Sequence, residues 1–241
     1  MVHVADERSE VEAERDAFAA FVERVDACPA RPPSRVASEP HPRTSVRPTV
    51  NAAAAPDRSA RLRQAYRETV MAVDHYDAVY GESLATNAAT ELGTDVATAL
   101  CGGVPVTAAL KTALYDAAVD ARAERERFGA VLRRERRSLA DAHAELDDVV
   151  TDLCRHQDIP RTRPDDGKSP SPLPELERRC EHAGDERQAV VQRQLQFARV
   201  DDALYDYLYG DRSWTYPVLS TVATLVEDIT AARRRASEAH R

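Results

Sequence analysis

Residues 114–153 read LYDAAVDARAERERFGAVLRRERRSLADAHAELDDVVTDL. Within this stretch, apolar side chains recur at alternating steps of four and three residues, which is the repeat of one apolar face on a long α-helix. The positions of that face are Leu114, Ala118, Ala121, Arg125, Phe128, Leu132, Glu135, Leu139, Ala142, Leu146, Val149 and Leu153. One helix cannot bury such a face by itself, so the pattern predicts a long helix packed against a second helix.

A partner for this helix follows in the same chain. Four prolines between residues 159 and 172 predict a loop, and a second apolar repeat begins directly after it. The positions of the second repeat are Leu173, Leu176, Cys180, Ala183, Arg187, Val190, Gln194, Phe197, Asp201, Leu204 and Leu208. We therefore expect an all-α fold built on a long antiparallel helical hairpin over residues 106–209, similar to a coiled coil.

Folding about this loop brings the polar positions of the two faces together. The expected pairings are Arg125 with Asp201 or Asp202, and Glu135 with Arg193 or Gln194. Polar residues that meet within an otherwise apolar face specify the register of two helices. We therefore expect these pairings to align the hairpin.

Helices are also predicted outside the hairpin, over residues 7–27, 57–80 and 83–100 and after Pro217. Asp57 or Ser59 and Ser83 are the expected N-caps. The segment 28–56 contains seven prolines and predicts an extended linker. The expected organisation is a short, loosely tethered N-terminal helix (1–27), the proline-rich linker (28–56) and a helical domain (57–241).

Composition narrows the class of protein. The 241 residues carry a net charge of -8, and only two of the 33 basic residues are lysines. Such acid-rich, lysine-poor chains are typical of a high-salt cytoplasm, although a GC-rich genome also favours alanine and arginine. The longest uncharged stretch, residues 96–110, is too short for a membrane span, and residues 1–10 have no apolar signal-peptide core. We expect a soluble, cytoplasmic protein.

Three kinds of site are not predicted. The segments Cys154-Arg155-His156 and Cys180-Glu181-His182 place the Cys and His two residues apart, so on a helix they point about 200° apart and cannot share a metal ion. The arginines of residues 133–137 and 233–235 suggest nucleic acid, but interleaved acids make an ion-pair face the preferred interpretation for the first group. His75, beside Asp74 and Asp77, is interpreted as structural. We expect no metal, no cofactor and no catalytic residue.

Two aromatic stretches, residues 66–80 and 205–219, hold seven of the eight tyrosines and the single tryptophan. They predict a small aromatic-rich helical head built from residues 57–105 and 204–235, in which the rings pack together. The alternative is a binding surface on this head. The candidate binding residues are Tyr66, Arg67, Glu68, His75, Tyr76, Tyr80, Asp211, Arg212, Trp214 and Tyr216.

These stretches resemble a haloarchaeal family of uncharacterised proteins, the domain of unknown function number 7260. The resemblance rests on Ala65–Tyr76, on Tyr207–Gly210 and on Tyr216–Leu219, and it spans residues 60–235. The N-terminal helix and the linker are expected to lie outside it. The resemblance supports the helical fold and implies no activity, ligand or catalytic residue.

The leading functional hypothesis is a non-enzymatic protein–protein interaction or scaffold module whose partner is another protein or a second copy of the chain. One alternative is a nucleic-acid-associated regulator, which requires a contiguous basic face. The other is a ligand binder or enzyme centred on the aromatic head, which requires the candidate binding residues to converge on a pocket.

Overall fold

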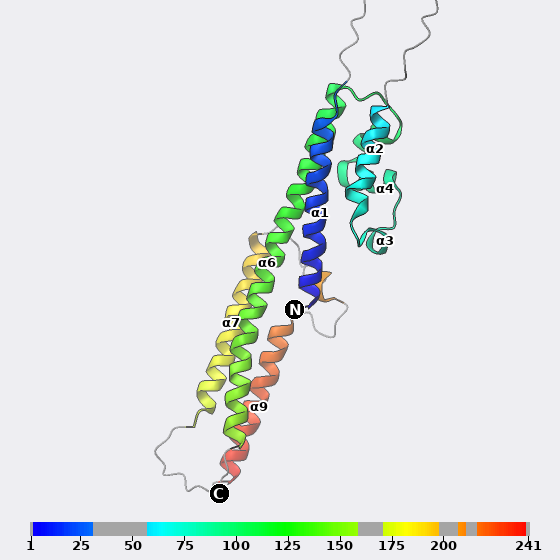
Figure 1. The fold of residues 1–241 in the computed structure, drawn as a ribbon. Coiled ribbons are helices and arrows are strands. Elements are labelled where there is room, and N and C mark those ends of the chain that lie inside the picture. The colour runs from blue at the N-terminus through cyan, green and yellow to red at the C-terminus, as the bar shows by residue number, and fades with distance from the viewer. Residues whose placement is uncertain (1, 31–56, 159–170, 198–206, 211–215, 240–241) are drawn as a thin grey trace, which may run out of the picture. The chain divides into compact units, whose positions relative to one another are not determined.

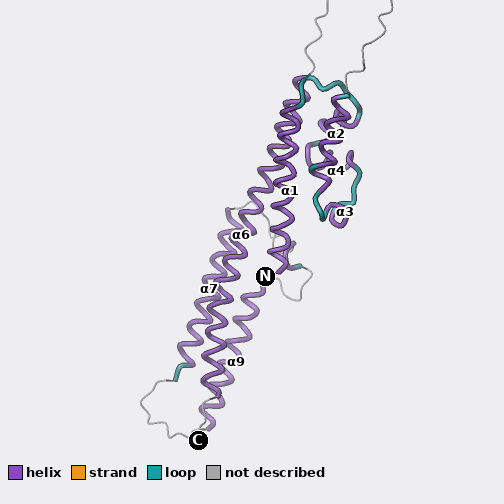
Figure 2. Tube along the Cα trace, in the orientation of Figure 1, coloured by secondary structure: helices purple, strands orange, loops and turns teal. Residues whose placement is uncertain are grey.

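The structure is a computed structural model of the chain and describes residues 2–30, 57–158, 171–197, 207–210 and 216–239. Every regular element in these residues is a helix, which confirms the predicted all-α class (Figures 1 and 2). The elements are α1 (Val2–Ala27), α2 (Arg58–Glu68), η1 (Val70–Ala72), α3 (Tyr76–Val79), α4 (Leu84–Leu92), α5 (Thr94–Cys101), α6 (Ala108–Asp158), α7 (Leu173–Phe197) and α9 (Pro217–Ala239). Among the described helices, none has the length and apolar character that crossing a membrane requires.

The chain forms two compact units. The N-terminal unit spans Glu7–Ala130, and the C-terminal unit spans Val131–Arg241 together with Met1–Asp6. Residues 57–105 belong to the N-terminal unit and the described residues of 204–235 to the C-terminal unit, so the structure does not confirm the predicted aromatic head. Tyr66 and Tyr76 of the first stretch are buried, whereas in the second stretch Tyr209 is buried and Tyr207 and Tyr216 are exposed.

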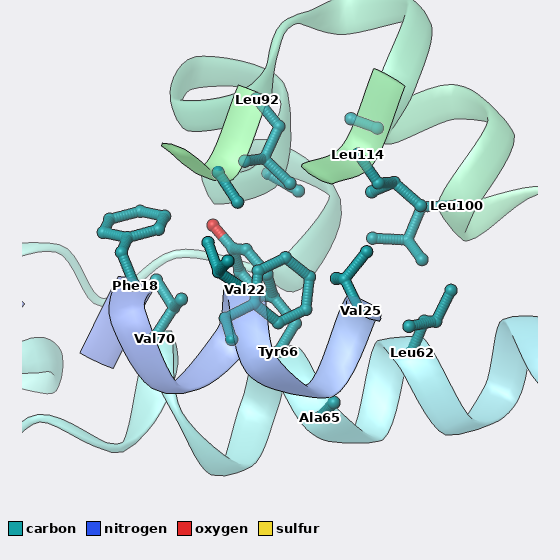
Figure 3. Packing of buried hydrophobic residues seen from close by; sticks show 14 of the residues in the cluster. Phe18, Val22, Val25, Leu62, Ala65, Tyr66, Val70, Leu92, Leu100 and Leu114 are labelled. Carbon is teal, nitrogen blue, oxygen red and sulfur yellow. The ribbon is translucent and has the colours of Figure 1, made fainter. Parts of the chain in front are cut away.

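The core of the N-terminal unit joins five helices (Figure 3). Phe18, Val22 and Val25 of α1 meet Leu62 and Tyr66 of α2, and α4, α5 and the start of α6 close the cluster. Fully burying a side chain of this size stabilises the fold by about 1.5–3 kcal/mol. The first helix is therefore part of this core, which differs from the loosely tethered helix that we expected.

The predicted helix 57–80 is interrupted in the structure. Asp57 caps α2 by accepting a hydrogen bond from the Ser59 backbone N–H at 3.0 Å, but α2 ends at Glu68. The Thr69 hydroxyl donates to the Ala65 carbonyl at 2.7 Å, a side-chain bond that competes with the helical backbone. Val73 is then extended, and a separate short helix, α3, follows.

The predicted helix 83–100 is also two helices. Ser83 caps α4 by accepting a hydrogen bond from the Thr86 backbone N–H at 3.2 Å, as expected. Gly93 then adopts φ 87°, a left-handed conformation that L-residues with a side chain rarely adopt, and α5 starts after it. The sequence predicted one continuous helix here because the apolar residues on both sides of Gly93 keep a helical spacing.

Helix α6 buries the face that its repeat predicts. Ten of the twelve positions are buried, and Arg125 and Phe128 are half-buried. In the C-terminal unit, Asp152 pairs with Arg179, while Glu135 pairs with Arg187. Later residues of α6 thus meet earlier residues of α7, as an antiparallel arrangement requires.

The expected register pairings are wrong where the structure tests them. Glu135 pairs with Arg187 rather than with Arg193 or Gln194, a difference of nearly two turns. Arg125 pairs with Glu14 and Glu91 of the N-terminal unit, while Asp201 and Asp202 lie outside the described residues. The expectation came from folding the chain about the loop between residues 159 and 172. It considered the hairpin alone and so could not include the contacts of Arg125 with α1 and α4.

Helix α9 packs antiparallel against α7. Glu177 pairs with Arg233, and a Cβ added at Gly184 would lie 3.4 Å from a methyl group of Val222. The small residue therefore permits close approach of the two helices. In the C-terminal unit, α6, α7 and α9 run side by side (Figure 1).

Candidate functional site

A group of partly buried polar side chains in the N-terminal unit surrounds Glu14. We call Glu14, His75, Tyr80, Glu91 and Arg125 the Glu14 network. Helix α1 supplies Glu14, the residues flanking α3 supply His75 and Tyr80, α4 supplies Glu91, and α6 supplies Arg125. The network thus connects segments that are up to 111 residues apart in the chain.

Both oxygens of the Glu14 carboxylate accept hydrogen bonds. Tyr80 donates its hydroxyl to Oε1 at 2.7 Å, and His75 Nε2 lies 3.0 Å from the same oxygen. Arg125 donates Nε to Oε2 at 3.0 Å and Nη2 to Glu91 Oε1 at 2.7 Å. The guanidinium carbon of Arg125 also lies 5.0 Å from the centre of the Phe18 ring, within range of a cation–π interaction.

These contacts change the protonation of the network. Burial alone raises the pKa of Glu14, but the hydrogen bonds from Tyr80, His75 and Arg125 outweigh it and lower that pKa below 4.5. Burial, followed by the hydrogen bond to Glu14, raises the pKa of the Tyr80 hydroxyl. Burial lowers the pKa of Arg125, yet its bonds to Glu91 and Glu14 dominate and raise it. Glu14 is therefore held ionised and Tyr80 neutral at pH 7.

A second network of the same chemistry lies in the C-terminal unit. We call Glu135, Ser138, Arg187 and Tyr209 the Glu135 network. Arg187 binds Glu135 through two hydrogen bonds of 2.5 and 3.0 Å and donates to the Ser138 hydroxyl at 2.9 Å. Tyr209 donates its hydroxyl to Glu135 Oε1 at 2.8 Å. The side chains of Glu135 and Arg187 are only 0% and 2% exposed.

Neither network is arranged as a catalytic site. A glutamate side chain that already accepts hydrogen bonds on both oxygens is poorly placed to act as a general base, which needs a free position facing the proton it removes. The arginines are bound by carboxylates rather than directed at an open position. Within the described residues, no three His, Cys, Asp or Glu side chains are grouped so that they could hold a metal ion. The arrangement can fix the relative positions of helices.

Several predicted binding residues have other roles in the structure. Tyr66 is buried, donates its hydroxyl to Asn87 Oδ1 at 2.7 Å and packs edge-on against Phe21 with ring centres 5.1 Å apart. Tyr76 is also buried, and its hydroxyl donates to the Glu82 carbonyl at 3.3 Å. These two tyrosines cannot contact a partner without rearrangement.

The remaining predicted binding residues have different surroundings where the structure describes them. His75 and Tyr80 join the Glu14 network, whereas Arg67 and Glu68 are exposed, with Glu68 bound by Arg24 and Gln64. Tyr216, in the other unit, is exposed. Asp211, Arg212 and Trp214 lie outside the described residues.

Sequence analysis missed Glu14 and Glu91, although a signal was present. Glu14 stands between Val11 and Phe18 at the three- and four-residue steps of the apolar face of α1. Glu91 lies seven residues after Leu84, on the buried side of α4. A charged residue at a position of an apolar repeat predicts a buried partner of opposite charge. Arg125 occupies such a position in the repeat of α6, so acids at similar positions in other helices were candidates for its partners.

Comparison with known protein families gives one match. The model of the family described as Domain of unknown function (DUF7260) matches residues 1–233. The chain belongs to this family. The match includes the N-terminal helix and the linker, which corrects the narrower range of 60–235 that the motifs suggested.

Membership of the DUF7260 family fits a core in which α1 packs with later helices, because the matched region begins before α1. Neither a curated protein nor a solved structure matches the chain.

Proposed function

We propose that this member of the DUF7260 family is a non-catalytic helical module that binds another protein through exposed surfaces of its helices. The observation that supports this proposal is the state of the reactive side chains. In both networks, the carboxylate, guanidinium and phenol groups bind one another and hold helices together. What is left for recognition is the outer surface of the helices.

An enzyme or a small-ligand binder would need candidate groups that converge on an open pocket. Tyr66 and Tyr76 are instead buried within the N-terminal unit, and Arg67 is exposed. A surface built from long charged helices is better suited to a macromolecular partner, for which specificity comes from many complementary contacts.

The test is affinity capture from a lysate of the source cells with the full tagged chain as bait, followed by mass spectrometry. We expect a protein to co-elute in stoichiometric amount. A co-eluting nucleotide, nucleic acid or small molecule without any protein would contradict the proposal. The capture is done at low and at molar salt, because contacts between exposed charges weaken when the Debye length falls to about 3 Å at 1 M.

Two exposed apolar side chains help to locate the surface. Val79 and Tyr115 of the N-terminal unit are 56% and 38% exposed, so Val79→Ser and Tyr115→Ser should leave the core intact. If the partner binds this unit, these variants should capture less of it. A variant such as Leu62→Ser is not a suitable control, because Leu62 is buried and its loss would unfold the site. Asp95→Ser, at an exposed position of α5, is the matched control.

A further inference from the structure

The second half of α6 carries charges that are segregated by sign along its exposed side. Four arginines come first, and four acids follow within the next three turns. The basic group is Arg133, Arg134, Arg136 and Arg137, and the acidic group is Asp141, Glu145, Asp147 and Asp148. All are exposed except Glu145, which is half-buried. We call this surface the α6 charge face.

Most of these charges are not used inside the chain. Elsewhere neighbouring charges do pair, as in Arg122 with Glu126, Arg155 with Asp152 and Arg178 with Glu175. Within the described residues, by contrast, seven members of the face have no ion pair: Arg134, Arg136, Arg137, Asp141, Glu145, Asp147 and Asp148. The helix therefore presents separate positive and negative ends to an outside partner.

The spacing of the two groups makes the face complementary to itself. Arg133 precedes Asp147 by 14 residues, and Arg134 precedes Asp148 by the same number. Fourteen residues are nearly four helical turns, so both groups lie on the same side of α6, about 21 Å apart along its axis. A two-fold axis between them brings the positive end of one copy to the negative end of another.

The facing residues follow from this symmetry. In an antiparallel pair of α6 helices, facing positions have numbers that add to about 281. Arg133 then faces Asp148, Arg134 faces Asp147, and Arg136 faces Glu145. The middle of the face contains the exposed alanines Ala140 and Ala144, whose small side chains allow the helices to approach closely.

We propose that a second copy of this chain docks antiparallel on the α6 charge face. The proposal deepens the proposed function, on which it rests, by naming the partner and the surface. A parallel pair in register would place arginine beside arginine and aspartate beside aspartate, which is unfavourable. A nucleic acid fits less well, because the acids on the same face would repel its phosphates.

The experiment is sedimentation equilibrium of the full chain at about 0.15 M salt, with two charge-reversed variants. One variant, Arg133→Asp with Arg134→Asp, places acids opposite Asp148 and Asp147 of the second copy. The other, Asp147→Arg with Asp148→Arg, places arginines opposite Arg134 and Arg133 of the second copy. Both change exposed residues, and circular dichroism verifies that they keep the helical content of the wild type.

We expect the wild type to be a dimer whose dissociation constant rises at 1 M salt. Each variant alone should dimerise at least about tenfold more weakly, because like charges then face each other at both ends. Mixed in equal amounts, the two variants should form a heterodimer, since the acids introduced in one variant then face the arginines introduced in the other. Damage to the fold could not produce this recovery.

Asp116→Arg with Asp120→Arg is the matched control. It changes two exposed acids at the other end of α6 and alters the net charge by the same amount as the basic variant. This control should remain a dimer. A monomeric wild type would overturn the proposal, and so would variants that dimerise as the wild type does or a mixture that does not associate.

The outcome separates this inference from the proposed function. If the wild type is monomeric but captures a different protein from the lysate, the second-copy proposal fails and the interaction module stands. If it is monomeric and captures no protein, both fail.

Discussion

In the N-terminal unit, Glu14 accepts hydrogen bonds from a tyrosine, a histidine and an arginine, whereas in the C-terminal unit Glu135 accepts them from a tyrosine and an arginine. The two networks differ in depth. The side chains of Glu14 and Arg125 are 12% and 15% exposed, while those of Glu135 and Arg187 are 0% and 2% exposed. Because water screens the first pair and is excluded from the second, the same chemistry should stabilise the two units by different amounts.

The difference also concerns what each network joins. The Glu14 network ties α1 and α4 to α6, and it includes a histidine. The Glu135 network ties α7 and Tyr209 to α6 with no histidine among its members. We therefore expect the shallower network to respond to solution conditions and the deeper one to respond mainly to mutation.

The largest effect is expected at Glu135. The variant Glu135→Ala leaves the buried guanidinium of Arg187 without its carboxylate and should lower the free energy of unfolding of the C-terminal unit by about 3–5 kcal/mol. Urea denaturation measures this change in the free energy of unfolding. Hydrogen exchange of the α7 amides shows that the C-terminal unit is the part destabilised. The double variant Glu135→Leu with Arg187→Met removes both charges and should be more stable than the single variant. If Glu135→Ala were as stable as the wild type, the prediction that the buried Glu135–Arg187 pair stabilises the C-terminal unit would be wrong.

The corresponding change in the N-terminal unit should cost less. Arg125→Met removes the bonds to Glu14 and Glu91 but keeps much of the apolar stem of the side chain. Because water can reach the carboxylates, we expect a loss of about 2 kcal/mol, measured by urea denaturation. If Arg125→Met destabilises the protein more than Arg187→Met does, burial does not decide which network contributes more to stability.

Tyr80 and Tyr209 allow a finer comparison, because the same group is removed from each network. Tyr209→Phe and Tyr80→Phe each remove one hydroxyl that donates to a glutamate. Glu135 is fully buried, so the loss at Tyr209 should be about 1–3 kcal/mol, against about 1 kcal/mol or less at Tyr80. Thermal unfolding of the two variants beside the wild type measures the difference. Equal shifts in Tm, or a larger shift for Tyr80→Phe, would argue against the comparison.

The smallest effect on stability is expected from lowering the pH. The pKa of Glu14 is lowered by its hydrogen bonds, but burial opposes this shift. A carboxyl whose folded-state pKa lies below its ordinary value of 4.5 stabilises the fold above that value. This stabilisation is lost as the pH falls through the folded-state pKa. Urea denaturation between pH 7 and pH 3 should therefore show that the free energy of unfolding of the wild type falls with pH. The fall should be shallower in Glu14→Gln, which has no carboxyl at position 14. Parallel pH profiles for the two proteins would show that Glu14 is not the responding group.

Part of the candidate site could be predicted from the sequence. Arg125 and Glu135 stood out because each interrupts an apolar repeat, and a charge at such a position needs a partner. Their partners could not be found in this way. Arg125 is bound by Glu14 of α1 and Glu91 of α4, which lie 111 and 34 residues away from it along the chain, and no local pattern relates them.

The sequence by itself determined that the fold is helical, because the spacing of apolar residues is a local property that each stretch carries with it. The repeat of residues 114–153 specified the buried face of α6, and Ser83 and Asp57 specified two helix starts. Only the tertiary structure decided which helices bury those faces. It placed α1 in the core with Tyr66, broke the predicted helix after Glu68, and paired Glu135 with Arg187. The reason is physical: many helix pairings bury similar apolar area, and the choice among them depends on contacts between distant residues that satisfy buried charges and fill space.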